Sequence, residues 1–203
     1  MLIESVTLEG KYVRLEPLTL NHHAALCEVG LDEDLWRWTL ARVETPDDLR
    51  RYIRAALDEG VSGVSLPFAT IEKQTGRAVG STRFGNIDRA NRRLEIGWTW
   101  VARNWQRTAV NTEAKYLMLR HAFETLDAIR VEFKTDSLNE RSRRAILRLG
   151  AKEEGTFRNH MIVHDGRLRH SVYYSIIADE WPTVRATLEE KVGKGEVGKR
   201  GSG

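Results

Sequence analysis

The sequence has only one cysteine and no long apolar run, and these two absences exclude several classes of protein. Cys27 alone cannot form an internal disulfide or a cysteine-based zinc cluster. A chain without disulfides suits a reducing compartment, and we expect a cytoplasmic protein. No apolar run approaches the roughly 18 residues of a transmembrane helix, and residues 1–6 lack the basic segment and apolar block of a secretory signal.

The chain of 203 residues also has little net charge. The 32 basic and 29 acidic side chains leave a formal net charge of +3. A dedicated nucleic-acid-binding protein usually carries a dense basic stripe, so the composition does not favour that class. The length suits one domain that buries about 70% of its unfolded surface without a disulfide or metal. We assign this domain to residues 1–192 and expect a flexible tail, rich in glycine and lysine, at residues 193–203.

The spacing of apolar residues predicts a mixed α/β (α+β) fold in which helices and strands alternate. Alternation of apolar and polar residues predicts a hairpin or bent strand near residues 6–18, and further strands at residues 66–72, 78–87, 92–101, 130–135, 151–163 and 168–177. Helical spacing and capping residues predict helices at residues 19–29, 45–60, 108–126, 139–149 and from 180 onward. Turn residues join neighbouring strands as hairpins, so we expect one mixed sheet with helices packed on it.

The segment at residues 94–113 joins a strand to a helix and forms the first candidate site. Its loop, residues 102–107, carries Arg103 and Arg107, and small residues follow. Unpaired backbone N–H groups at a helix start carry partial positive charge and can bind a phosphate. Residues 101–120 contain four basic side chains and one acid. Spacing alone favours the simpler interpretation, an ordinary connection with solvated arginines.

A second candidate region lies at the start of the next short helix. Asn139 is placed to cap this helix, and Ser142 lies nearly one turn further along. Taken alone, Asn139 is explained as a cap and Ser142 as a partly exposed helix hydroxyl. Gly150 ends the helix, and the pair Glu154-Gly155 follows.

The two regions together resemble the GCN5-related N-acetyltransferase (GNAT) family, and in particular its RimJ/RimL-like branch, which includes ribosomal-protein N-terminal acetyltransferases. The family's acetyl-CoA loop has the pattern Gln/Arg-x-x-Gly-x-Gly/Ala and falls on residues 106–111. Gln106 is kept, whereas the two small positions hold Ala109 and Asn111 instead of glycine.

Further residues strengthen this resemblance, which covers most of the chain from about Arg14 to Trp181. The loop starts five residues after Val101, as in the family. The Asn139-x-x-Ser142 pattern also matches the Rim-type branch. Each piece is moderately specific, and the joint pattern is specific.

The resemblance implies a GNAT fold with a mostly antiparallel sheet of six to seven strands, flanked by helices. Two central strands, the one ending at residue 101 and the one starting near residue 130, would splay apart in a V. Acetyl-CoA, as co-substrate, would lie in this splay, and no metal is expected. The implied contacts come from the strand, the loop with its helix start, and the later helix: Trp98, Trp100, Val101, Gln106, Arg107, Thr108, Ala109, Val110, Asn111, Thr112, Asn139 and Arg144.

The implied reaction is direct acyl transfer in a ternary complex. A neutral amine attacks the thioester carbonyl, a strand N–H near Trp100 stabilises the oxyanion, and the CoA thiolate leaves. Many family members use a tyrosine as general acid, but Ile146 stands at that position here. Rim-type members can use the serine of Asn-x-x-Ser, so Ser142 is the candidate that stabilises the leaving thiolate. The glutamate that some members place after Gly155 is replaced by Met161.

The general base has several candidates. Glu95 lies on the splayed strand and could reach the amine directly or through water, and an ion-paired strand carboxylate is the competing explanation. His160 and His170 have an unperturbed pKa that suits proton transfer near neutral pH. Both histidines could instead be surface residues of a hairpin, so the sequence leaves the base open.

Five of the six tryptophans lie in regions that the resemblance places at the cleft, three of them at positions 98–105, and Trp181 begins the last predicted helix. Trp36 and Trp38 lie between the first two helices, where family members shape the acceptor site. They form either an aromatic lid that attracts the ammonium or a loop packed on the core. Residues 139–170 carry eight basic and four acidic side chains, which suits the CoA 3′-phosphate, an acidic substrate or a solvated helix face.

The leading hypothesis is an acetyl-CoA-dependent N-acetyltransferase that acetylates a primary amine, on a protein N-terminus or on a small molecule. One alternative is a non-catalytic acyl-CoA-binding module, because the usual tyrosine and glutamate are missing. A second alternative is a ribosome- or RNA-associated protein that uses the arginine-rich segment. We expect no membrane partner, no dedicated nucleic-acid binding, and a monomer or homodimer.

Overall fold

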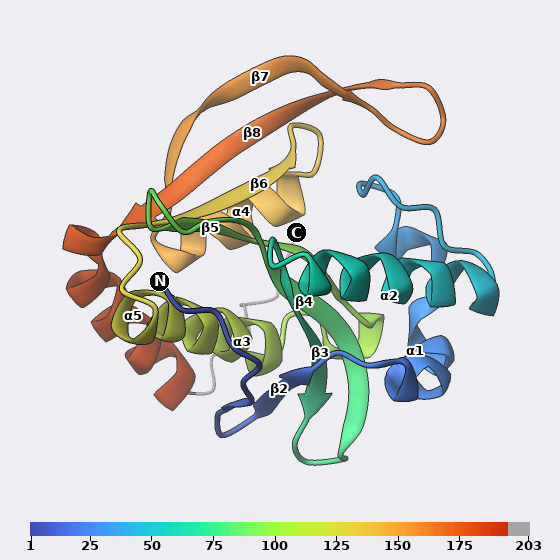
Figure 1. Cartoon of the computed structure of the whole chain (residues 1–203), viewed down its shortest axis with the longest axis horizontal. Helices are drawn as coiled ribbons and strands as arrows, with labels where there is room; N and C mark the ends of the chain where they lie inside the picture. Colours follow the sequence, from blue (N-terminus) through green and yellow to red (C-terminus); the bar gives the residue numbers. More distant parts are fainter. Residues whose placement is uncertain (195–203) are drawn as a thin grey trace, which may run out of the picture.

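A twisted sheet of eight strands runs through the computed structural model, which describes residues 1–194 (Figure 1). The strands are β1 (Leu8–Glu9), β2 (Val13–Pro17), β3 (Leu66–Glu72), β4 (Arg77–Asp88), β5 (Arg93–Val101), β6 (Arg130–Asp136), β7 (Lys152–Ile162) and β8 (Leu168–Ile177). Their order across the sheet is β1-β2-β3-β4-β5-β6-β8-β7. Neighbouring strands pair antiparallel except β5 and β6, which run parallel.

The predicted fold class is confirmed, and the strand count is eight rather than six to seven. The difference arises at residues 6–18, which fold as a hairpin with two strands. Its first strand, Leu8–Glu9, has only two residues. The expected tail lies, from residue 195 onward, outside the described residues.

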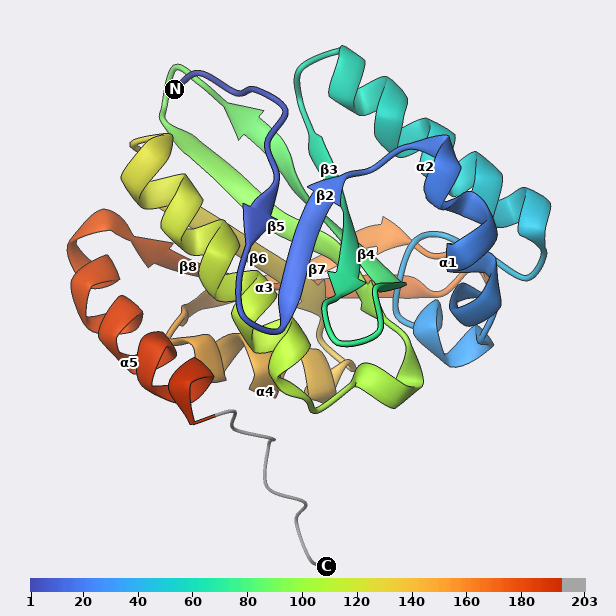
Figure 2. The ribbon, with the colours of Figure 1, turned by 90° about the horizontal axis from the view of Figure 1, so that it is seen from below.

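Within residues 1–194, five α-helices cover the sheet, and each face has its own group. They are α1 (His23–Gly30), α2 (Pro46–Val61), α3 (Ala109–Arg120), α4 (Glu140–Leu149) and α5 (Trp181–Gly193). Leu94 and Ile96 of β5 join a core cluster with α3, α4 and α5, whereas Trp100 joins a second cluster with α1 and α2. Figure 2 shows α1 and α2 beside each other and away from α3 and α5. Side chains alternate along a strand, and the adjacent residues Phe68 and Ala69 of β3 fall in the first and the second cluster, so the two clusters mark the two faces of the sheet. Trp100 lies on the second face because β5 holds one extra residue between Gly97 and Trp100.

The helix predicted at residues 108–126 is α-helical only as far as Arg120. A single π-helical turn, His121–Thr125, completes it. Its only acid within residues 109–120, Glu113, is 3% exposed and accepts hydrogen bonds from the backbone nitrogens of Lys11, Tyr12 and Val13 at 2.8, 2.6 and 2.8 Å. This carboxylate therefore fixes the turn between β1 and β2 on α3.

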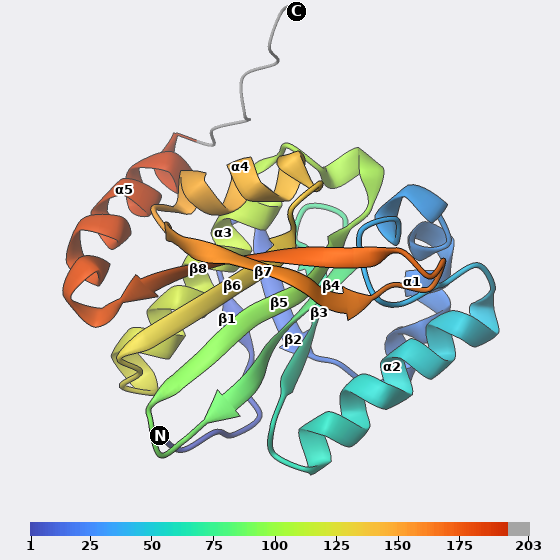
Figure 3. The same ribbon diagram turned by 90° about the horizontal axis from the view of Figure 1, so that it is seen from above.

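The β7–β8 hairpin extends beyond the rest of the sheet and reaches the loop before α2 (Figure 3). Arg169 Nη1 on β8 donates to the carbonyl oxygen of Trp38 in that loop at 3.4 Å. The pairing of β7 with β8 shifts register between Phe157 and Met161, so this part of β7 bulges away from a regular ladder.

The single thiol is half-buried on α1. Cys27 Sγ lies 3.3 Å from His23 Nε2, and burial raises the pKa of this thiol.

Within residues 1–194, no helix has both the length and the apolar character needed to cross a membrane.

Candidate active site

The sheet opens between β5 and β6. These strands pair at three positions only, Arg93 with Arg130, Leu94 with Val131 and Glu95 with Glu132. Beyond them β5 continues to Val101 and β6 to Asp136 without pairing to each other. The edge of β5 that faces the opening has no strand partner along this stretch, so an extended ligand can pair with it as a further strand would.

A β-bulge at Trp98 accompanies the opening. The pairing of β5 with β4 jumps from Gly97–Arg83 to Trp100–Ser81, so β5 holds one extra residue, and Trp98 has a φ of +49°. Gly85 on β4 gives the Trp98 ring its room, because a Cβ there would lie 2.3 Å from the ring.

The loop that leaves β5 leads directly into the start of α3. Gln106 Nε2 donates to the carbonyl oxygen of Val101 at 2.9 Å and holds the loop against the strand end. Arg107 has a φ of +61°, which is uncommon for a side chain of its size. Thr108 caps α3 by accepting from the backbone N–H of Val110 at 3.3 Å. Asn111 lies within α3 and has no positive φ, so this position does not require a glycine backbone here.

The head of α3 is well suited to an anion. Its first turn contains no acidic side chain, so the positive end of the helix dipole is not neutralised within the helix. Arg107 beside it is exposed. The Oδ1 atom of Asn111 is buried and has no hydrogen-bond partner within residues 1–194, so this acceptor is open to a donor group of a ligand rather than to the anion itself. A phosphate-bearing ligand fits this donor-rich helix start, with the small side chain of Ala109 at its first position.

The start of α4 lies beside this loop. Arg141 Nη1 donates to Gln106 Oε1 at 2.7 Å, and Arg148 Nη2 donates to Thr112 Oγ1 at 3.2 Å. Asn139 caps α4 by accepting from the backbone N–H of Ser142 at 3.1 Å. The Ser142 hydroxyl is half-buried and makes no hydrogen bond to residues 1–194, so it is available to a ligand.

The structure thus brings most of the residues expected at the acetyl-CoA site into one region, around the end of β5 and the starts of α3 and α4. The Trp100 side chain is 4% exposed and packs in the core cluster with α1 and α2, so the part of this residue that a ligand in the opening could contact is its backbone. Arg144 points into solvent, with a side chain 73% exposed, and pairs with Glu140 at 3.1 Å.

Glu95 lies on the opposite face of the sheet from α3 and α4. Its side chain is 3% exposed, accepts from Asn86 Nδ2 at 2.7 Å, and pairs with Lys134 Nζ at 3.2 Å. The same ammonium lies 5.8 Å from the ring centroid of Trp98 and 5.7 Å from that of Tyr173. Glu95 is therefore an ion-paired strand carboxylate, and it lies beside the point where the splay begins.

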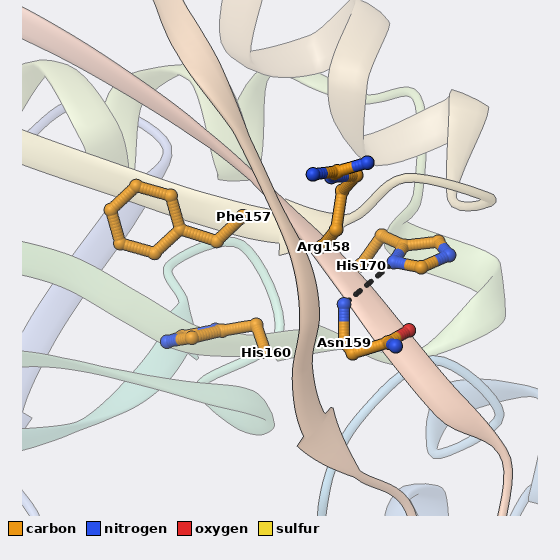
Figure 4. Close-up of a pocket in the computed structure, with 5 residues that line it drawn as sticks. All are labelled: Phe157, Arg158, Asn159, His160 and His170. Atoms are coloured by element: carbon orange, nitrogen blue, oxygen red, sulfur yellow. Dashed lines mark hydrogen bonds between the residues drawn. The ribbon is translucent and has the colours of Figure 1, made fainter.

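The two histidines of the hairpin occupy opposite sides of β7 and β8. Figure 4 shows His160 beside Phe157, and His170 on the other side with Asn159, whose backbone N–H donates to His170 Nδ1 at 2.8 Å. His160 Nδ1 lies 3.0 Å from Ser171 Oγ. Burial lowers the pKa of His160, and the nearby charges of Lys134 and Arg169 lower it further. The His160 ring therefore favours the neutral form, which can accept a proton.

The tryptophans expected at the acceptor site lie in different environments. Trp36 is 3% exposed, donates from Nε1 to the Gly30 carbonyl oxygen at 2.7 Å, and packs 5.4 Å from Trp100 between ring centroids. Its packing matches the second interpretation, a loop packed on the core. Trp38 is half-buried, with the Arg37 and Arg167 guanidinium carbons 5.1 and 5.6 Å from its ring centroid.

Sequence reasoning missed three buried cations, Arg83, Lys115 and Arg169, which are 3%, 6% and 6% exposed. Lys115 Nζ donates to Thr82 Oγ1 at 3.0 Å and to Thr99 Oγ1 at 2.5 Å, and burial lowers the pKa of this lysine to about 7. A signal for Lys115 exists in the sequence, since it lies one turn before the buried Met118 on the predicted apolar face.

A sheet split between two parallel strands, with an acid-free helix start beside the split, defines a class of α/β proteins that bind an extended, phosphate-bearing ligand. Comparison with known sequences specifies the class. Residues 13–152 match the family model described as "Acetyltransferase (GNAT) domain". The chain belongs to the GNAT family of acetyltransferases, as its motifs predicted.

Several individual proteins are similar to this chain. A GCN5-related N-acetyltransferase from Brucella melitensis has 31% sequence identity and a TM-score of 0.87 over 97% of this chain and 92% of that one. Mycobacterium smegmatis RimJ, solved in complex with CoA-disulfide, has 26% identity and a TM-score of 0.78 over 91% and 90% of the two chains.

A curated relative from Bacillus subtilis, "Putative ribosomal N-acetyltransferase YdaF", is 35% identical over 106 residues. That match spans 52% of this chain and 57% of the relative, a little more than half of each. These similarities agree with the RimJ/RimL-like branch indicated by the sequence motifs.

Proposed function

We propose that the protein transfers the acetyl group of acetyl-CoA to a primary amine, on a protein N-terminus or on a small molecule, by direct attack in a ternary complex. The observation that carries this proposal is the acid-free start of α3 beside the unpaired edge of β5. The M. smegmatis relative, described as a complex with CoA-disulfide, supports a coenzyme A ligand at this kind of site.

The residues on the α3 side are suited to hold the coenzyme. The backbone of Trp98, Trp100 and Val101 offers a strand edge for an extended arm, and residues 106–112 offer N–H groups for phosphates. Asn139 and Arg144 of the α4 region lie on the same side and would contact the coenzyme as well. Acetyl-CoA supplies an activated thioester, and no metal is needed for this chemistry.

The two faces of the sheet divide the proton transfers between them. Ser142 lies at the start of α4, on the α3 face, and its free hydroxyl can donate a hydrogen bond to the leaving thiolate. Glu95 and His160 lie on the other face, where the amine would enter and must lose a proton. We favour the neutral His160 as the acceptor of this proton, with Glu95 holding Lys134 in place. A β5 N–H near Trp100 would stabilise the oxyanion.

The acceptor face would be walled by Trp38 and Trp98. The name of the B. subtilis relative supports a protein N-terminus as one acceptor class. We further propose a single domain over residues 1–192, a cytoplasmic location, and a monomer or homodimer.

Titration calorimetry with acetyl-CoA tests the cofactor proposal first, and absence of binding would refute it. Release of CoA thiol with a panel of peptides and small amines then tests turnover. Binding without turnover for every acceptor would instead indicate a non-catalytic acyl-CoA-binding module.

Replacing Ser142 by alanine tests the assigned donor. We expect turnover to fall roughly tenfold to a hundredfold, the value of a hydrogen bond to a charged group, while acetyl-CoA affinity changes little. Ser62→Ala, at the far end of α2, is the matched control and should leave turnover unchanged. Equal turnover in Ser142→Ala and the wild-type protein would remove the proposed role.

A further inference from the structure

The acceptor face of the sheet holds four cations around the opening, and three of them have an acidic partner. Lys134 pairs with Glu95 at 3.2 Å, Arg167 pairs with Asp136 at 2.7 Å, and Arg83 pairs with Glu59 at 2.7 Å. The fourth, Arg169 on β8, forms no salt bridge with any residue from 1 to 194. Arg169 is therefore the one member of these four without an acidic partner among the described residues.

The surroundings of Arg169 make this charge costly. The residue is 6% exposed, and burial lowers the pKa of its guanidinium. Nε donates to Ser171 Oγ at 3.1 Å and Nη1 donates to the Trp38 carbonyl oxygen at a long 3.4 Å. Nη2 donates to no residue within the described chain. Asp136, the acid with the largest electrostatic effect on this guanidinium, already accepts from Arg167 and from the Leu138 backbone. A buried cation without a partner is unfavourable until an anion reaches it.

Arg169 is connected to the candidate base. Ser171 Oγ contacts both Arg169 Nε and His160 Nδ1, at 3.1 and 3.0 Å. The guanidinium and the imidazole are thus two hydrogen-bond contacts apart on one face of the hairpin. An acceptor whose amine lies near His160 would place its next few atoms near Arg169.

We propose that Arg169 binds a carboxylate of the acceptor, so that the preferred substrates are amines that carry an acid group close to the reacting nitrogen. This inference rests on the proposed acetyl transfer and names the substrate class for the same site. The planar guanidinium has N–H groups free for a carboxylate. A carboxylate also matches the single uncompensated charge, whereas a doubly charged phosphate would exceed it and meet the nearby carboxylates of Asp136 and Glu95.

The proposal is tested with acceptor pairs that differ only in a carboxylate or its amide. Two suitable pairs are peptides with aspartate or asparagine at the second position, and free aspartate or asparagine. We expect kcat/KM to favour the acid by about tenfold or more. Arg169→Met should abolish this preference while acetyl-CoA binding and acetylation of the amide partner persist. The peptide pair and the free amino acids separate the two sources of the carboxylate.

Arg158→Met is the matched control. Arg158 is exposed on β7 and points to the other side of the strand from His160 (Figure 4), so this variant should keep the preference. Equal use of acid and amide by the wild-type protein, or a preference that survives in Arg169→Met, overturns the inference and leaves acetyl transfer intact.

If no acceptor of the panel is acetylated, the result counts against the proposed acetyl transfer. The carboxylate site at Arg169 is then tested separately, by binding of the N-acetylated peptides. In the presence of CoA, the N-acetylated aspartyl peptide should raise the melting temperature of the wild-type protein in a saturable way. The asparaginyl peptide should not, and Arg169→Met should respond to neither. The same response to both peptides would overturn the carboxylate site.

Discussion

Two helices of this protein start with a threonine cap, and the difference between them separates a structural helix start from a functional one. Thr45 begins α2 with a capping box, in which Asp48 Oδ2 accepts from the Thr45 backbone N–H at 2.9 Å. Asp47 adds a second acid to that first turn. Thr108 begins α3 with no acid in the first turn. In α2, carboxylates of the helix itself interact with the positive end of the helix dipole. The first turn of α3 has no such carboxylate, so its positive end is available to an anionic ligand.

The charges deeper in the two helices differ in the same way. Arg51 and Arg54 of α2 are exposed to solvent. In α3, Glu113 and Lys115 are buried at 3% and 6% exposure, where each holds a neighbouring segment of the chain. Glu113 and Lys115 thus serve the tertiary contacts of α3, and neither lies in its first turn.

Replacing Lys115 by methionine should have the largest effect, because it removes a buried ionisable group. The pKa of Lys115 is lowered to about 7 in the folded protein, against about 10.4 in an unfolded chain. Below pH 7 both states bind the proton and the folded state bears the full cost of the buried charge. As pH rises from about 7 to about 10, the unfolded state binds more protons, so the stability of the wild-type protein should increase.

Urea unfolding at several values between pH 6 and pH 10 measures this contribution. Lys115→Met should be the more stable protein at pH 6, by up to a few kcal/mol, and the difference should shrink as pH rises. The same pH slope in both proteins would show that Lys115 does not titrate in this range.

Glu113→Gln tests whether the buried acid of α3 holds the β1–β2 turn. The amide cannot accept from three backbone N–H groups as the carboxylate does, so we expect a loss of about 2–3 kcal/mol in the free energy of unfolding. Glu28→Gln is the control, because Glu28 on α1 is 63% exposed and pairs only with Arg77 at the surface, and its loss should be below about 1 kcal/mol. Equal losses in urea unfolding would contradict the assigned role.

Asn111→Asp converts the first turn of α3 into one that resembles α2. The added carboxylate should lower acetyl-CoA affinity about tenfold, through repulsion of the phosphates. Asp47→Asn in α2 is the reciprocal change and should slightly lower stability without altering acetyl-CoA affinity. Calorimetry at low and high salt measures both variants, and an unchanged affinity for Asn111→Asp at low salt would argue against phosphate binding at α3.

The periodic parts of the fold were predictable from the sequence, because hairpins and capped helices follow local rules. The β3–β4 and β7–β8 hairpins and the cap of α4 by Asn139 appear close to where their residues place them. The bulge at Trp98 was not predictable, because the alternation of apolar and polar residues along a strand does not reveal one inserted residue.

The candidate site was predictable where it follows a motif and not where it depends on tertiary contacts. The Gln106 to Thr112 segment and Ser142 are brought together through Arg141 and Arg148. Arg169 gives no local signal, because charged residues are expected at the surface, and its burial involves a contact with the distant Trp38 loop.

The lone thiol beside His23 has a consequence for any measurement of turnover. Thiol reagents react with the thiolate, and the raised pKa of Cys27 keeps its thiolate fraction low near neutral pH. Half-buried on α1, it should react slowly compared with free CoA. A disulfide reagent added to a working reaction would then report released coenzyme over a small and steady protein background, so this enzyme can be followed continuously without first removing its cysteine.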